Sequence, residues 1–234
     1  MISGATSTQV VNGGWAPTAI FTAPHAGSFT IKVKATLPNG STQWSDPYQW
    51  TVALITGWAS PQVVGGGKTN FGVSFSVPGT KFQWQYYDVA KGTWTWIGTP
   101  NVPTDSNWAT FTAPHLGQFT IRVTATTPDG SLSQTSDYPW TVDKIIAGWA
   151  SPQVVGGGKT NFGVVFNVSG TKFLWQYYDV AKGTWNWIGT PNVPTDSNWA
   201  TFSAPHTGTY WIWVRAIAPD GTSEEQQQTY TWTA

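Results

Sequence analysis

The feature that most constrains the fold of this chain is an internal repeat with a spacing of 91 residues. The segment GWASPQVVGGGKTNFGV begins at Gly57 and begins again at Gly148. From these glycines to His115 and His206, the two copies are identical at 53 of 59 positions. A spacing of this length predicts a tandem array in which each copy is large enough to form a small domain.

A third, abbreviated copy precedes these two. PHAGSFTIKVKATLPNG, which starts at Pro24, matches the PHLGQFTIRVTATTPDG of the next copy, and Tyr48–Val52 matches Tyr138–Val142. About forty residues, Lys68–Asn107 of the next copy, have no counterpart there. We therefore expect an abbreviated N-terminal repeat, a complete middle repeat and a complete C-terminal repeat, with bounds 1–53, 54–145 and 146–234.

The N-terminal repeat has a consequence of its own. It retains TQVVNGG, Thr8–Gly14, as a counterpart of the first strand, together with the last three strands, but it lacks the central hairpin. Half of a sandwich exposes a core face and strand edges. We expect this repeat to dock on the middle repeat, on another subunit or on a larger particle, and thus to serve as an anchor.

Short runs of alternating apolar residues, separated by Gly and Pro, fill each complete copy. In the middle repeat, Phe82, Trp84 and Tyr86 alternate with polar residues, and a later strand alternates from Phe119 to Ala125. This period of two predicts strands with one buried face. Seven runs are expected, starting with Trp58–Val64, Phe71–Val77 (Phe71, Val73, Phe75 and Val77 inward), Phe82–Tyr86, Thr93–Ile97, Trp108–Phe111, Phe119–Ala125 and Tyr138–Val142.

Several residues resemble those of immunoglobulin-like domains. Trp84 resembles their core tryptophan, and APHxGxF/Y resembles the corner before the sixth strand, where Tyr210 is the corner tyrosine. FQWQYYDVAKGTWTWIG and the opening ISGATST resemble the tandem immunoglobulin-like repeats of bacterial surface adhesins and phage structural proteins. The resemblance implies an all-β fold of tandem immunoglobulin-like β-sandwiches, two full and one abbreviated.

The composition excludes several classes of partner. Charged residues make up only 9% of the chain and the formal net charge is zero, so no basic patch is expected to bind nucleic acid. No apolar run is long enough for a membrane span. Met1–Gly14 lacks the layout of a signal peptide, so we expect either a removed leader or a virion protein released by lysis. Uncharged polar surfaces are typical of secreted, cell-surface and virion proteins.

No constellation of residues predicts catalysis. His25, His115 and His206 share one position of the repeat and are expected to be corner residues bonded to neighbouring backbone. Glu224 and Glu225 are adjacent on a strand, so they face opposite sides and cannot act as a carboxylate pair. We expect a protein that is not an enzyme and that needs no cofactor and no metal.

The segment GGGKT, Gly65–Thr69, superficially resembles a phosphate-binding loop and recurs at Gly156–Thr160. Gln62 and Gln153 stand where that motif requires glycine, and no helix is expected after either copy. We therefore interpret the segment as a flexible connection into the second strand.

The candidate binding surface lies where the two complete repeats differ. The sixth strand carries outward Thr120 and Arg122 in the middle repeat, and outward Trp211 and Trp213 in the C-terminal repeat. The third strand is its expected neighbour in the sheet. There Leu174 replaces an outward glutamine, and Tyr178 extends the same face. An exposed apolar face of this kind indicates an interface or a ligand platform.

Three interpretations of this face stay open: contact with another protein, cover by the C-terminal tail or a neighbouring domain, and glycan binding. A second set of candidate residues follows the DVAKG loop, where packing over the sandwich edge competes with binding; it comprises Trp94, Trp96, Trp185 and Trp187. The leading hypothesis is a structural or adhesion protein of a virion or cell surface that contacts other surface proteins or itself. The alternative is a secreted carbohydrate-binding module whose partners are cell-surface glycans.

Overall fold

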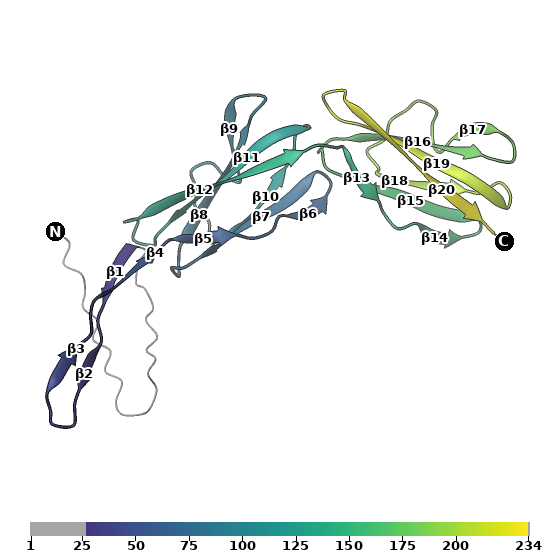
Figure 1. Ribbon diagram of the computed structural model, residues 1–234. Helices are drawn as coiled ribbons and strands as arrows, with labels where there is room; N and C mark the ends of the chain where they lie inside the picture. The colour runs from purple at the N-terminus through teal and green to yellow at the C-terminus, as the bar shows by residue number, and fades with distance from the viewer. Residues whose placement is uncertain (1–26, 234) are drawn as a thin grey trace. The chain divides into compact units, whose positions relative to one another are not determined.

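The computed structural model describes residues 27–233, and every regular element in that range is an antiparallel β-strand (Figure 1). The chain divides into two compact units, Met1–Ala53 and Leu54–Ala234. The second unit contains both complete repeats. Within the described range there is no helix that could cross a membrane.

The middle repeat forms two four-stranded sheets. One sheet has the order β10-β7-β5 with β6 also paired to β7, and the other has the order β12-β11-β8-β9. The third and sixth strands, β8 and β11, are therefore direct neighbours, as the immunoglobulin-like resemblance implies. The strands are β5 (Ile55–Trp58), β6 (Gln62–Gly65), β7 (Lys68–Phe75), β8 (Lys81–Asp88), β9 (Thr93–Ile97), β10 (Trp108–Thr112), β11 (Gly117–Thr126) and β12 (Ser133–Val142).

The C-terminal repeat has the same two sheets. Their orders are β13-β15-β14 with β18 paired to β15, and β17-β16-β19-β20. This shared strand order makes the second unit a tandem of all-β, immunoglobulin-like sandwiches. The strands are β13 (Ile146–Trp149), β14 (Gln153–Gly156), β15 (Lys159–Phe166), β16 (Lys172–Asp179), β17 (Thr184–Trp187), β18 (Trp199–Ser203), β19 (Gly208–Ile217) and β20 (Ser223–Trp232).

The core of each sandwich consists of the inward residues of the two sheets. Trp84 and its counterpart Trp175 are both buried, which confirms the prediction for the core tryptophan. Each large apolar side chain that is fully removed from water contributes roughly 1.5–3 kcal/mol before entropy is counted. The inward residues of the sixth strand, Phe119, Ile121, Val123 and Ala125, are buried as the alternation predicts.

The first two expected strands differ from the observed ones. The first run is split into β5 and β6 because Pro61 lies between them and lacks the N–H that a continuous ladder needs. The second strand ends at Phe75, whose ring packs on the buried Phe82 at 5.2 Å, so it lies on the expected inward face although it is 39% exposed. Beyond the strand end, Val77 is buried as expected.

The glycine segment is a hairpin turn. Gly65, Gly66 and Gly67 join β6 to β7, and their φ angles of 89°, 65° and 75° lie in the region that disfavours side chains. Three consecutive residues of this kind require glycine. The structure confirms that the segment connects into the second strand, and its flexibility stays a prediction.

The described part of the N-terminal repeat consists of two short antiparallel pairs. β1 (Gly27–Ile31) pairs with β4 (Tyr48–Val52), and β2 (Lys34–Thr36) pairs with β3 (Thr42–Trp44). The equivalent strands of the middle repeat, β11 and β12, run without interruption. An extra residue in the SDPYQW segment, compared with SDYPW, accounts for the break between the pairs.

Two predictions for the N-terminal repeat, the first strand at Thr8–Gly14 and the corner role of His25, lie outside the described residues. In the described part, several large apolar side chains are exposed, including Val33 at 64% and Tyr48 at 66%.

Candidate functional site

The candidate site is the outer face of the sheet β17-β16-β19-β20 in the C-terminal repeat. On β19, Tyr210, Ile212 and Val214 are fully buried, so the residues between them point away from the core. Trp211 is 36% exposed and Trp213 is half-buried. The alternation of the strand therefore places both tryptophans on the outer face, as predicted from the sequence.

Cross-strand pairing brings four aromatic rings together on this face. Tyr178 on β16 lies opposite Trp211 on one side and opposite Trp185 on the other. The Tyr178 and Trp211 rings are stacked, with centroids 4.8 Å apart and planes 22° apart, and Trp185 lies 5.2 Å from Tyr178. Trp213 meets Trp185 edge to face at 6.5 Å. These four residues are called the aromatic ridge below.

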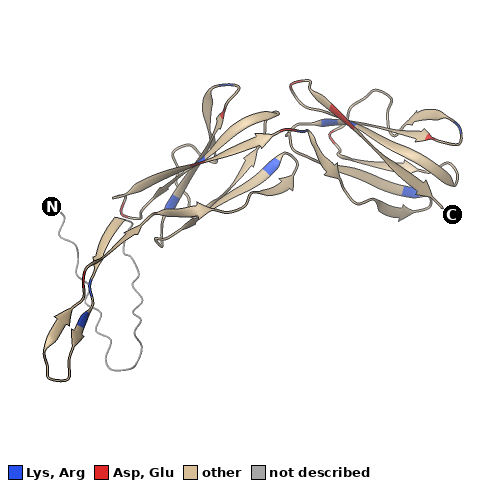
Figure 2. Cartoon of the chain, in the orientation of Figure 1, with Lys and Arg blue, Asp and Glu red and all other residues tan. Residues whose placement is uncertain are grey.

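The middle repeat has a charged arrangement at the equivalent place. Arg122 lies over the ring of Trp94, with its guanidinium carbon 4.0 Å from the ring centroid, and forms two 2.7 Å hydrogen bonds to Asp137. Thr120 takes the position of Trp211. Figure 2 shows how thinly charged residues are spread over the described chain. The aromatic ridge is thus specific to the C-terminal repeat, although the fold beneath it is the same.

The remaining predicted residues lie on the same faces but outside the ridge. Leu174 is half-buried and pairs with Arg215, two residues along the strand from Trp213. Trp187 is half-buried and lies opposite Gln176. The structure therefore unites Tyr178, Trp185, Trp211 and Trp213, and it leaves Leu174 and Trp187 at the margin.

Among the described residues, the C-terminal strand lies beside the ridge and not over it. Ser223–Trp232 forms β20, which pairs along the free edge of β19. The indole of Trp185 is 45% exposed, and β17 is the edge strand on the other side of the sheet.

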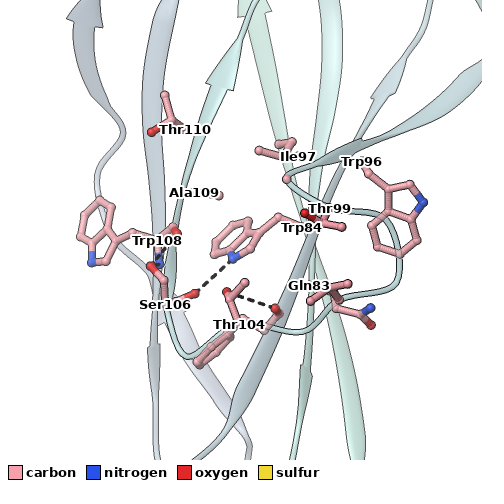
Figure 3. Close-up of a pocket in the computed structure, with 13 residues that line it drawn as sticks. Gln83, Trp84, Trp96, Ile97, Thr99, Thr104, Ser106, Trp108, Ala109 and Thr110 are labelled. Carbon is pink, nitrogen blue, oxygen red and sulfur yellow. Dashed lines mark hydrogen bonds between the residues drawn. The ribbon is translucent and has the colours of Figure 1, made fainter.

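A shallow hollow of about 330 Å³ lies in the middle repeat, between the end of β9 and the segment that leads into β10 (Figure 3). Trp96 lies at its rim, and the indole N–H of Trp84 donates to the carbonyl oxygen of Ser106 at 3.4 Å. Its lining contains no charged or imidazole side chain. The hollow therefore offers neither a general base nor an ion pair for a reacting group.

Sequence reasoning missed a partly buried Asp–His pair at the corner of each complete repeat. The ring of His115 bonds the backbone oxygen of Leu116 at 2.6 Å, as predicted, and its Nε2 also lies 2.8 Å from a carboxylate oxygen of Asp88. The second copy joins His206 to Asp179 at the same distance. The recurrence of DVAKG and PHxG in both copies was the available signal, but the two motifs lie 27 residues apart.

The Asp88–His115 pair alters the titration of both groups. Burial alone would raise the pKa of Asp88, but hydrogen bonds from His115 and from the Lys91 backbone bring that pKa below its ordinary value. Burial would lower the pKa of His115, but its bonds to Leu116 and Asp88 raise that pKa instead. Two oppositely charged partners that stabilise each other in this way indicate a structural clamp at the corner.

The corner tyrosine has the contact that the resemblance implies. The hydroxyl of Tyr210 donates to the backbone oxygen of His206 at 2.6 Å, and the Tyr210 side chain is fully buried. In the middle repeat, Phe119 takes this position and forms no such bond. The corner histidines and the tyrosine therefore hold the fold and are not arranged around a reacting group.

No family model matches the sequence, and no curated protein matches it. Among solved structures, the chain is similar to the chicken interferon gamma receptor alpha chain, with 12% identity, a TM-score of 0.42 and coverage of 77% of this chain and 98% of that one. A two-domain fibronectin type-III segment of chicken tenascin shows 12% identity, a TM-score of 0.33 and coverage of 75% and 96%. The fibronectin(III)-like modules of Clostridium thermocellum CbhA show 16% identity, a TM-score of 0.28 and coverage of 76% and 93%. Likenesses this remote carry no argument about function, and the assignment to immunoglobulin-like sandwiches rests on the strand order and register described above.

Proposed function

We propose that the chain is a non-enzymatic structural or adhesion protein displayed on a virion or a cell surface, and that its aromatic ridge binds another protein of the same assembly. One observation carries the proposal. After their 59 nearly identical positions the two repeats diverge, and on one outer face of the same sheet Trp211 and Trp213 replace Thr120 and Arg122. Neither tryptophan is needed by the core, because the middle repeat forms the same sheet without them.

The orientation of the rings favours a protein partner over a sugar. Side chains on a sheet stand roughly perpendicular to it, and Tyr178 and Trp211 turn their faces toward each other at 22°. A ridge of upright, stacked rings presents its edges outward, whereas a sugar ring stacks on an open aromatic face. Upright aromatic groups with a polar edge suit the buried centre of a protein interface, where tryptophan is a frequent anchor.

The N-terminal repeat supplies the second contact of the proposed assembly. In its described part, Val33, Tyr48 and Trp44 are each more than half exposed, and exposed apolar side chains of this size are candidates for a contact surface. We infer that this repeat anchors the chain to its assembly, while the aromatic ridge forms the contact at the other end of the sequence.

The experiment uses the residues of the middle repeat as replacements. Trp211→Thr with Trp213→Arg gives the C-terminal repeat the polar outer face of the middle repeat, whose equivalent sheet carries Thr120 and Arg122 at these positions. Hydroxyl-radical footprinting of the native assembly should show protection of Trp211 and Trp213 relative to the isolated chain, and the double variant should lose incorporation into the assembly. The matched control is Arg215→Thr, which changes the same face outside the ridge and should incorporate normally. Equal labelling of the two tryptophans in the assembly and in the free chain would refute the proposal.

A second candidate function, carbohydrate binding, has one observation in its favour. Trp185 lies on the edge strand β17 and is 45% exposed, so part of its ring is available to a sugar. A glycan array with intrinsic fluorescence as the readout separates the two candidates. Saturable quenching by a glycan that is lost on Trp185→Thr, together with normal assembly of that variant, would replace the protein-contact proposal with this one.

A further inference from the structure

Within the 59 nearly identical positions of the two complete repeats, half of the substitutions lie on one short segment. Of the six differences within this block, three lie at the end of the second strand or just after it: Val165 replaces Ser74, Asn167 replaces Ser76 and Ser169 replaces Pro78. None of them belongs to the aromatic ridge. A segment that changes while its surroundings stay fixed indicates a separate role for that segment.

This segment of the C-terminal repeat contacts the glycine turn of the middle repeat. The N–H of Gly67 donates to the backbone oxygen of Phe166 at 2.9 Å, and the N–H of Ser169 donates to the backbone oxygen of Ala113 at 2.9 Å. A Cβ placed on Gly65 would lie 3.6 Å from Val165. Two of the three substituted residues therefore lie at this junction, and the third, Asn167, lies between them.

The substitution at position 169 determines which repeat can make the junction. Proline has no N–H, so Pro78 of the middle repeat cannot form the bond that Ser169 forms to Ala113. The substitution at position 165 places a branched apolar side chain beside the glycine turn where the middle repeat has serine. The segment of the C-terminal repeat is thus suited to docking, and the equivalent segment of the middle repeat is not.

The glycine turn supplies the complementary surface. Gly67 has a φ of 75°, and a Cβ there would lie 2.5 Å from the backbone nitrogen of Ser169. The counterpart Gly158 has the same φ of 75°, but its Cβ would meet only the oxygen of Ala204, at 3.9 Å. The same glycine is therefore covered by a docked segment in one repeat and open among the described residues of the other.

We propose that Val165–Ser169 of the C-terminal repeat is a dedicated docking segment for the Gly65–Gly67 turn of the middle repeat, so that the two sandwiches move as one body. The inference does not depend on what the aromatic ridge binds. It assigns the glycine turn a role in joining repeats, and it makes the junction directional, because only a repeat with a free N–H at the position of Ser169 can dock.

Spin labels measure the junction directly. The chain contains no cysteine, so Ala90→Cys and Ala181→Cys, on exposed equivalent loops of the two repeats, accept one label each. Double electron–electron resonance on the full chain should give a narrow distance distribution. Gly67→Ala should broaden it, because the new methyl group displaces Ser169, whereas Gly158→Ala imposes the same backbone strain and should leave it narrow.

Ser169→Pro provides a second variant. The sandwich fold tolerates proline at this position, since the middle repeat carries Pro78 there. Ser169→Pro removes the bond to Ala113 and should broaden the distribution, and Pro78→Ser is its matched control and should not. Three outcomes would overturn the proposal: a broad distribution in the unmodified chain, a narrow one in both Gly67→Ala and Ser169→Pro, or equal broadening by Gly158→Ala. Amide exchange within each repeat confirms that every variant is folded.

Discussion

Replacement of Asp88 by asparagine should remove a pH dependence from the middle repeat. The Asp88 side chain is buried, and one of its oxygens accepts hydrogen bonds from the backbone N–H groups of Ala90 and Lys91 at 3.1 and 3.2 Å. Its other oxygen faces Nε2 of His115, whose Nδ1 faces the backbone oxygen of Leu116. Both ring nitrogens thus face acceptors, and only the protonated imidazolium can donate to both.

The sign of the effect follows from the two pKa shifts. The pKa of His115 is raised in the folded chain, so its stabilisation is complete below the ordinary value of about 6.5 and is lost as the pH rises through the folded pKa. The pKa of Asp88 is lowered, so its contribution is present above about 3.8 and is lost as the pH falls through the folded pKa. The pair stabilises the repeat most between these two values.

The magnitude corresponds to one charge-assisted hydrogen bond. Such bonds contribute about 1.5–3 kcal/mol, and the 14% exposure of the His115 side chain favours the lower end, about 1.5 kcal/mol. In Asp88→Asn, the amide can donate to neutral Nε2 while its oxygen still accepts from the backbone. The neutral ring is then satisfied, so the loss of stability above pH ~6.5 should disappear.

The assay is an NMR titration of the histidine ring protons, together with urea unfolding at pH 5.5 and pH 8.5. His115→Gln identifies the His115 resonance by its disappearance, and Asp105→Asn, at an exposed pair with Lys81, is the control that should leave the titration unchanged. We expect the His115 midpoint to lie above 6.5 and to fall in Asp88→Asn. A midpoint at or below 6.5 in the unmodified chain, or an unchanged midpoint in Asp88→Asn, would refute the clamp.

Three further predictions concern packing and the corner. Gly72→Ala should lower the free energy of unfolding by about 1–3 kcal/mol, measured in urea, because the new methyl group overlaps the Trp108 indole. Gln134→Ala should cost about 1–3 kcal/mol in the same measurement, because the buried N–H of Leu54 then has no acceptor. Tyr210→Phe should cost about 1 kcal/mol, because it removes only the corner hydrogen bond.

The first two of these predictions have controls in the chain itself. Gly57→Ala adds a methyl group where no atom lies within 4 Å, so it should be close to neutral. Gln134→Glu should be tolerated, because Glu224 accepts the equivalent two backbone bonds in the C-terminal repeat. A cost for Gly57→Ala equal to that of Gly72→Ala would show that the loss of backbone freedom, and not the contact with Trp108, determines the effect.

The strands could be predicted from the sequence where apolar and polar residues alternate along a single strand. The alternation from Phe119 to Ala125 describes a central strand with one buried face, and β11 follows it. At the end of the second strand, Phe75 keeps the apolar period and packs on Phe82, but its side chain is 39% exposed. Hydrophobic period records which residues are apolar, and it cannot record how completely the facing sheet covers each of them.

For the candidate site, the residues on one strand could be predicted from the sequence, but the contacts between strands could not. Trp211 and Trp213 were predictable from alternation within one strand. The stacking of Tyr178 on Trp211 depends on the register between β16 and β19, which no local pattern encodes. The Asp88–His115 pair is even less predictable from local sequence, because the two residues come together only after two strands and a corner have folded.

The two complete repeats share one fold, so the sequence differences between them can be treated as substitutions in that fold. Three of the six differences gather on Val165–Ser169, at the junction, and Leu174 lies on the outer face that carries the aromatic ridge. Nothing in the structure explains Asn186 or Ser203. Because the strand order is the same in both repeats, the differences at Val165, Ser169 and Leu174 alter the junction and the outer face rather than the fold.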